Sequence, residues 1–290
     1  MTTSDTIRRL SYDADGPVDI TVGIGSGAVE VHLRDEPGVD VEIRPAASDN
    51  PWAEGLTALM SWVGSAMGDD RALDLSGEAV AQARVDFGGR ALSVRSAKSG
   101  HLRAVPVAVV VRAPAGSSVN CRTGDGAVTV SGRADRVEVG TTGGEISVDE
   151  ATGAVRLTSG TGPIRLGPAP GGGHLRSGSG TIEVAALGGS STVATSSGEI
   201  RLGRVTADLL VRTGTGDIAI KEAVSGTVEL TSGSGSFRVG VAGPAEFDLV
   251  STSSVARSEV PVTQKRVDGV PLRVSGRTGS GTILVHKAAV

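Results

Sequence analysis

Short runs in which apolar residues alternate with polar or small ones fill most of the chain between residues 105 and 243. Apolar side chains at every second position are typical of a β-strand with one buried face. The runs follow one another in pairs, and each pair spans about 18 residues. The pattern therefore predicts an all-β protein built from a repeated unit of two short strands.

One glycine marks the same place in every unit. It recurs at intervals of 18 residues, with a last interval of 19, at Gly126, Gly144, Gly162, Gly180, Gly198, Gly216 and Gly235. Gly27 and Gly281 occupy the same local pattern outside the regular series. We expect these glycines to lie at a corner between two strands, where the backbone needs a positive φ or leaves no room for a Cβ atom.

Apolar residues stand in register around this glycine, five positions before it and two and four positions after it, as Leu157, Ile164 and Leu166 do in one unit. A column seven positions after it is weaker because it includes Arg133 and Ala242. One unit is too small to bury its own apolar face, so stacked units would share a core. We therefore predict a single-stranded β-solenoid, or β-helix, with about 18 residues per coil and coils about 4.8 Å apart.

A column of hydroxyl residues stands three positions before the glycine. Its members are Thr123, Thr141, Ser159, Ser177, Thr195, Thr213, Ser232 and Thr278. We expect these hydroxyls to bond the turn backbone. The alternative is a flat hydroxyl array that binds ice or a glycan, and the irregular column directly before the glycine argues against it.

Both ends of the chain lose the repeat. We predict a flexible tail over 1–10, N-terminal strands and a capping region over 11–104, the regular solenoid over 105–243, and irregular C-terminal coils with a cap over 244–290. In the capping region an apolar stripe predicts one short helix over about 51–67. Gly88 and Gly89 predict a hairpin between strands at 80–87 and 91–95. Caps would protect the strand edges and the core at open ends.

Two tryptophans in the predicted helix are the candidate partner-binding residues. Trp52 falls on the apolar stripe, whereas Trp62 lies off it and is the better candidate for exposure. An exposed tryptophan stands out because aromatic residues are only 2% of this chain, and such residues anchor protein interfaces. The alternative is that the helix is only a cap that packs on the solenoid.

Composition and motifs argue against catalysis and against nucleic acid. The chain has 290 residues, 43 of them glycine, and a net charge of −4, so neither a basic surface nor stacking aromatics favour nucleic acid. The four histidines are scattered and the single cysteine, Cys121, falls in an inward column. We therefore predict no catalytic residue, no cofactor and no metal site.

No apolar run approaches the roughly 20 residues of a membrane span, and residues 1–10 lack the apolar core of a secretory signal. We expect a cytoplasmic protein with a protein partner or self-association. Arginines form two loose outward columns, one of Arg122, Arg176 and Arg212 and one of Arg165, Arg201 and Arg238. We interpret them as solvated faces, with an anionic partner as the alternative.

Three segments share one motif: 155–166 (VRLTSGTGPIRL), 210–220 (LVRTGTGDIAI) and 277–285 (RTGSGTILV). Together with a strand at 107–113 and the turn at 114–116, they resemble the bacterial putative adhesin family of β-strand-repeat proteins, whose function is unknown. The resemblance covers about residues 105–286 and implies a β-repeat fold without catalytic residues. The adhesin name implies surface attachment, and the absence of an export signal departs from that.

Together these patterns predict a non-catalytic β-solenoid that acts as a scaffold or as an adhesin-like binding module. Two alternatives stay open. A self-assembling filament of the bacterial cytoskeletal kind would need uncapped end coils. A polysaccharide-acting β-helix enzyme would need a cluster of carboxylates on adjacent coils.

Overall fold

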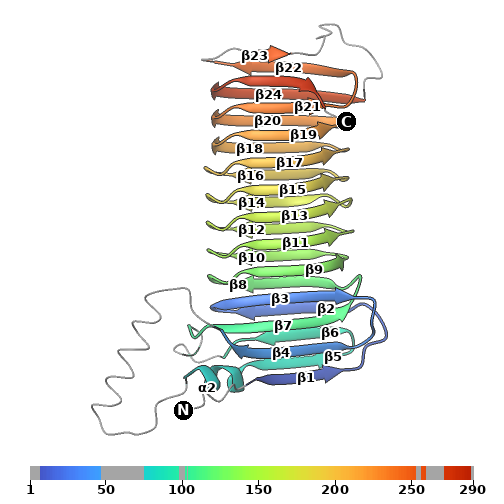
Figure 1. Ribbon diagram of the computed structural model, residues 1–290, viewed down its shortest axis with the longest axis vertical. Coiled ribbons are helices and arrows are strands. Elements are labelled where there is room, and N and C mark those ends of the chain that lie inside the picture. The colour runs from blue at the N-terminus through green and yellow to red at the C-terminus, as the bar shows by residue number, and fades with distance from the viewer. Residues whose placement is uncertain are drawn as a thin grey trace, which may run out of the picture.

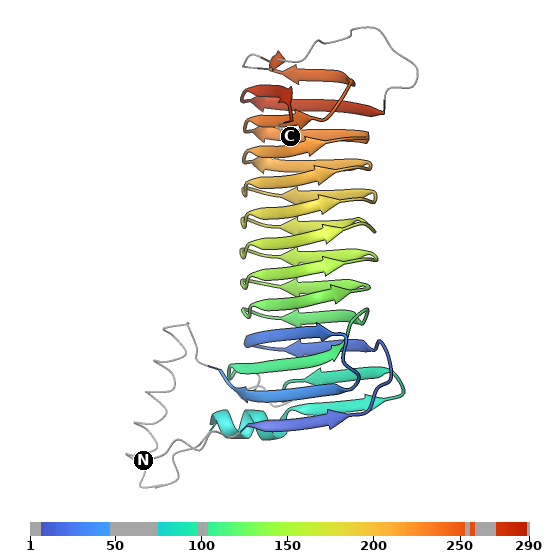
Figure 2. The ribbon, with the colours of Figure 1, turned by 45° about the vertical axis from the view of Figure 1, so that its right-hand side comes forward.

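The computed structural model describes residues 7–46, 75–97, 102, 104–252, 256–258 and 271–288. These residues form an all-β protein with one short helix, α2 (Leu75–Gln82), and two long sheets of thirteen and twelve strands. The sheets run side by side along the long axis of the molecule (Figure 1 and Figure 2). Apolar side chains from both sheets form one continuous core between them.

The thirteen-stranded sheet, called sheet A, contains in spatial order β1 (Arg8–Tyr12), β4 (Val39–Pro45), β7 (Val107–Pro114), β3 (Gly27–Arg34), β9 (Val128–Ala134), β11 (Ile146–Ala151), β13 (Ile164–Ala169), β15 (Ile182–Leu187), β17 (Ile200–Val205), β19 (Ile218–Ala223), β21 (Phe237–Val241), β25 (Ile283–Lys287) and β23 (Ala256–Ser258).

The twelve-stranded sheet, called sheet B, contains in spatial order β22 (Ala245–Ser251), β24 (Leu272–Ser280), β20 (Gly226–Ser234), β18 (Leu209–Thr215), β16 (Ser191–Thr195), β14 (Gly173–Ser177), β12 (Val155–Ser159), β10 (Val137–Thr141), β8 (Ser118–Thr123), β2 (Asp19–Ile24), β6 (Ala91–Arg95) and β5 (Arg84–Gly88).

From β8 to β21 the chain changes sheet with every strand. Each strand from β8 to β19 pairs in parallel with the strand two places further on, so that residues 18 apart, or 19 in the last two pairs, lie side by side, as Val139 lies beside Leu157. The apolar columns expected from the sequence are buried, and Leu157 and Ile164 have no exposed surface. Fully burying such a side chain contributes roughly 1.5–3 kcal/mol, and the stacked columns extend this along the whole core.

A strand of sheet B and the strand of sheet A that follows it form one layer of the molecule. Close packing between neighbouring layers explains the recurring corner glycine. A Cβ atom on Gly162 would overlap the carbonyl oxygen of Gly144, and the same holds at each step from Gly126 to Gly281. Only at Gly27, with φ of 114°, and Gly281, with φ of 145°, is the backbone also clearly in the region that favours glycine. The lack of space for a side chain is therefore the more general requirement.

Five of the eight hydroxyl residues bond the turn backbone, as the simpler interpretation expects. The amide of Gly180 donates to Ser177 Oγ at 2.9 Å, and the amide of Gly198 donates to Thr195 Oγ1 at 3.0 Å. The same bond recurs at Thr123 and Thr141. All eight hydroxyl residues are buried, which leaves no flat hydroxyl surface for a ligand. The hydroxyl column is therefore part of the turn structure and not a binding surface.

The position seven residues after the glycine is not the buried one in two strands, because the register shifts there. In β9 the buried position is Ala134 instead of Arg133, because an extra residue near Gly132, with φ of 90°, forms a bulge. In β21 the buried position is Val241 instead of Ala242. The core is therefore more apolar than the strict count of residues predicts.

Spatial order departs from chain order at both ends. The layer β2–β3 lies between β6–β7 and β8–β9, and the layer β24–β25 lies between β20–β21 and β22–β23. At the N-terminal end, a layer from early in the chain thus lies between two layers that come later. At the C-terminal end, a layer from late in the chain lies between two layers that come earlier. The pairing of β1, β4 and β5 is antiparallel, so the regular parallel stacking ends there.

The hairpin predicted around Gly88 is confirmed, since β5 and β6 pair in antiparallel register with Gly88 opposite Ala91. The expectation of a strand beginning at residue 80 is wrong, because α2 continues to Gln82 and β5 begins at Arg84. Ala79 and Val80 of α2 are buried in the core beside β4 and β7. The predicted helix over 51–67, with Trp52 and Trp62, lies outside the described residues. The division into segments stays a prediction.

Candidate binding groove

A break in the strand alternation hollows the outer face of sheet A. In β13 two consecutive residues, Gly167 and Pro168, lie outside the core between the buried Leu166 and Ala169. β15, β17 and β19 repeat this break at the same place, with two residues outside the core in each. The backbone bends there in register through neighbouring strands, so the bends form one continuous furrow.

The furrow is an open groove with a volume of about 670 Å³. Small residues, Gly167, Ala185 and Gly203, form its floor on three successive strands. Because these residues carry little or no side chain, the edges of core residues such as Leu166 and Leu202 also line the groove. The groove therefore offers an apolar floor on a face whose other residues are mostly charged or polar.

Alternating charges bound one side of the groove. Arg201 Nη2 lies 2.7 Å from Glu199 Oε2, and Arg201 Nη1 lies 2.9 Å from Glu183 Oε1. Arg165 completes the series, with Nε 3.5 Å from Glu183 Oε2 and its guanidinium in contact with Glu145. The hydrogen bonds that Arg201 donates to Glu199 and Glu183 raise the pKa of its guanidinium further above the usual range.

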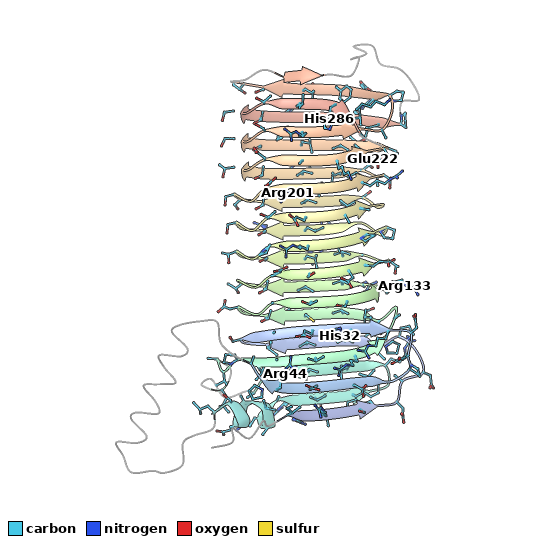
Figure 3. The ribbon with its side chains drawn as sticks, viewed as in Figure 1. His32, Arg44, Arg133, Arg201, Glu222 and His286 are labelled. Atoms are coloured by element: carbon cyan, nitrogen blue, oxygen red, sulfur yellow. The ribbon has the colours of Figure 1, made fainter. Side chains whose placement is uncertain are left out.

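These arginines are exposed, so solvent screens each ion pair and the pair alone contributes little to stability. Their importance is geometric, because the three carboxylates hold the guanidinium groups of Arg165 and Arg201 in one line along the groove. Figure 3 marks Arg201 and His286 along the stacked strands of this sheet.

The other end of the groove is different. Lys221, Arg238 and His286 line it from three adjacent strands, β19, β21 and β25. In the part of the chain that the structure describes, no carboxylate lies within ion-pair distance of Lys221 or Arg238. His286 Nδ1 is enclosed and has no hydrogen-bond partner among those residues. This end is therefore positively charged, and it contains a polar atom without a hydrogen-bond partner among the described residues.

The structure places the residues singled out from the sequence in three environments. The arginine column of Arg165, Arg201 and Arg238 lines the groove. The other column lies outside it on sheet B, where Arg122 Nη2 is 3.1 Å from Glu138 Oε1. The corner glycines lie at the turns between the sheets. Trp52 and Trp62 fall outside the described residues.

Sequence reasoning missed Lys221, His286 and the small floor residues. The signal that could have found them is the pair of residues between the last two apolar columns, where a regular strand would have one. Small residues at the first of these positions in consecutive units indicate a furrow.

Among the described residues, no three histidine, cysteine, aspartate or glutamate side chains are placed to hold a metal ion. Cys121 is buried, and burial raises the pKa of its thiol to about 12. Within the same ranges no helix has the length and apolar character needed to cross a membrane.

No protein-family model and no curated protein matches this chain. Solved structures similar to it include a putative adhesin from Bacteroides fragilis NCTC 9343, with 11% identity, a TM-score of 0.43 and 97% of each chain covered. A putative lipid binding protein from Parabacteroides distasonis ATCC 8503 has 15% identity, a TM-score of 0.43 and 98% of each chain covered. A putative adhesin from Parabacteroides merdae ATCC 43184 has 10% identity, a TM-score of 0.42 and 98% of each chain covered.

The adhesin names agree with the family that the sequence resembles. At these identities and TM-scores the likeness carries no statement about what this chain binds.

Proposed function

We propose that the protein is a non-catalytic β-solenoid that acts as a binding module, and that the groove on the outer face of sheet A is its binding surface. The observation that carries the proposal is the groove itself. Its volume of about 670 Å³ falls in the range of roughly 300–1,000 Å³ that is usual for ligand sites. It interrupts an otherwise regular sheet face at the same place in consecutive strands.

The groove is built on strands that pair on both sides with their neighbours. Such strands lose little conformational entropy when a ligand binds, because their backbone is already ordered. The paired charges of Arg165, Arg201 and Glu183 are held in the same way. A rigid, preorganised face favours a binding role over a role that depends on movement.

The groove lining favours binding over polysaccharide cleavage. Glu183 is the one carboxylate among the described lining residues, and two arginines hold it. Glycoside cleavage usually needs two carboxyl groups on either side of the scissile bond. The lining offers one, and its negative charge is already neutralised.

The N-terminal end favours a binding module over an end-to-end filament. α2 packs beside β4 and β7 and buries Val80 in the core, and the adjoining strands β1 and β5 pair in antiparallel fashion. A parallel coil of a second copy would meet the wrong strand direction there. We keep a protein partner and a cytoplasmic location as parts of the proposal that the sequence suggested.

Substitution at Ala185 tests the proposal directly. Ala185 is exposed on the groove floor, so Ala185→Trp should fill the groove while the core stays intact. Ala194→Trp is the matched control, because Ala194 faces outward from β16 of sheet B. Both variants and the wild-type full chain would be titrated with acidic polysaccharides, acidic peptides and charged and neutral amphiphiles, after circular dichroism has confirmed equal folding.

We expect at least one of these ligand classes to bind the wild type and Ala194→Trp, and to bind Ala185→Trp at least tenfold more weakly. If no class separates the two variants, the outer face of sheet A is not the binding surface and the proposal fails.

A further inference from the structure

The two ends of the groove differ in charge. At the end near Arg165, three glutamates surround two arginines, so the cluster carries a slight excess of negative charge. At the other end Lys221 and Arg238 have no carboxylate within ion-pair distance among the described residues. An exposed pair of unbalanced cations attracts an anion, and at the end of an apolar groove it also fixes the orientation of that anion.

Lys221 and His286 lie on strands to either side of Gly240 in β21. Gly240 is buried and pairs with His286, and a Cβ atom there would overlap the carbonyl oxygen of Lys221 on the neighbouring strand. Gly240 therefore places no side chain between Lys221 and His286. The enclosed Nδ1 of His286, which lacks a protein partner among the described residues, adds a polar atom to the same end. A compact anionic group fits this arrangement.

The rest of the groove suits an alkyl chain better than a sugar or a peptide. From Lys221 the groove continues past Ala219, Gly203 and Ala185 to Gly167. The described lining residues include no serine, threonine, asparagine or glutamine, and their one ring side chain is His286. Away from the cationic end, the hydrogen-bonding side chains of the described lining are Arg165, Glu183 and Arg201, which already pair with one another. A glycan needs stacking rings or many free hydrogen-bonding side chains, and a peptide needs partners for its backbone. An alkyl chain needs only apolar contact.

From these observations we propose that the groove binds an anionic amphiphile with a single alkyl chain. Its carboxylate or phosphate head contacts Lys221 and Arg238 beside His286, and its chain lies over Ala219, Gly203 and Ala185. Strands about 4.8 Å apart give a groove of roughly 19 Å from Ile220 to Val148, which a medium to long chain can fill. This inference rests on the proposed function, and it names the ligand class for the same site.

Calorimetric titration of the full chain with dodecanoate below its micelle concentration tests the contact with the head. Lys221→Gln combined with Arg238→Gln should weaken binding about tenfold or more, since two charge-assisted contacts are lost. The matched control is Arg212→Gln combined with Arg277→Gln, which changes the net charge equally on the outer face of sheet B. The control should bind within twofold of the wild type.

A series of hexanoate, octanoate, decanoate and dodecanoate tests the contact with the chain. A fully buried methylene group strengthens binding about fourfold, and in an open groove we expect about twofold per methylene. In Ala185→Trp the dependence on chain length should disappear beyond the shortest chains. Dodecyl phosphate should bind like dodecanoate if either head serves, and decanol, which has no charge, should bind at least tenfold more weakly than decanoate.

Three outcomes would overturn the inference: binding that does not depend on chain length, equal weakening by the two double variants, or no saturable binding at millimolar dodecanoate. If dodecanoate fails while another ligand class separates Ala185→Trp from Ala194→Trp, only the ligand assignment is wrong. If no class separates these two variants, the proposed function fails as well.

Discussion

Gly281 lies directly over Gly235, although 46 positions separate the two layers in the chain. The amide of Gly235 donates to the carbonyl oxygen of Ser280 at 2.9 Å, and a Cβ atom on Gly281 would overlap the Gly235 carbonyl oxygen. Gly27 and Gly126 have the same relationship at the other end. The column of corner glycines is therefore continuous in space where it is interrupted in sequence.

Gly162→Ala should strongly destabilise the protein, because its Cβ would overlap the Gly144 backbone, and neighbouring layers cannot separate without losing hydrogen bonds. We expect a loss of about 2–4 kcal/mol in the free energy of unfolding. The matched control is Gly140→Ala, since no atom lies within 4 Å of the corresponding Cβ position. Urea denaturation followed by circular dichroism measures both, and equal effects would contradict the steric explanation.

Ser177→Ala should cost about 1–3 kcal/mol, because it removes the acceptor for the buried amide of Gly180. Ser159→Ala, one layer away in the same column, should cost almost nothing, because Ser159 Oγ has no hydrogen-bond partner among the described residues. Thermal unfolding of the two variants gives the comparison. A larger loss in Ser159→Ala than in Ser177→Ala would show that the hydroxyl column stabilises the turns in another way.

Cys121 should resist alkylation in the folded protein. Burial raises the pKa of its thiol from 9.0 to about 12, so the reactive thiolate is scarce at pH 8, and the side chain has no exposed surface. Labelling with iodoacetamide, monitored by mass spectrometry, should occur only as fast as the chain unfolds. Labelling at the rate of a free thiol under native conditions would contradict the burial of this column.

The same pKa difference predicts a dependence of stability on pH. The thiol stays neutral in the folded chain but ionises in the unfolded chain above pH 9, so the folded state loses relative stability as the pH rises from about 9 to about 12. The loss should be about 1.4 kcal/mol per pH unit in that window. Cys121→Ala should remove this component, and an unchanged pH slope in that variant would argue against it.

Light scattering after size exclusion should give a mass near 29.0 kDa that does not change with protein concentration. The reason is that α2 buries Val80 at the N-terminal end and that β1 and β5 interrupt the parallel stacking. Negative-stain images of the same fractions provide an independent check. Rods that lengthen with concentration would favour the filament and would make the end layers the functional surface.

The regular part of the fold was predictable because one period repeats there. Leu157 and Ile164 belong to columns that fall in register along the sequence, and both are fully buried. The segment around Val80 was mispredicted because it carries two periods at once. Ala79, Val80 and Ala83 have helical spacing, whereas Ala83 and the residues after it alternate, and α2 ends where the second pattern begins.

The groove was only partly predictable. Arg165, Arg201 and Arg238 were visible as a column, but their ion pairs depend on Glu145, Glu183 and Glu199, which lie on different strands or at different positions of the repeat. The contribution of His286 could not be read from the sequence at all. His286 lines the groove only because β25 pairs directly with β21, although β22 and β23 lie between these two strands in the sequence.

The two ends of the molecule differ from its middle, and the middle layers from β10 to β19 are interchangeable in register. A tandem duplication of one 18-residue segment would therefore be accommodated as an extra layer without disturbing either end. It would lengthen the molecule and its groove by about 4.8 Å at a time. The number of 18-residue segments therefore sets the reach of the protein in fixed increments, separately from the chemistry of its two ends.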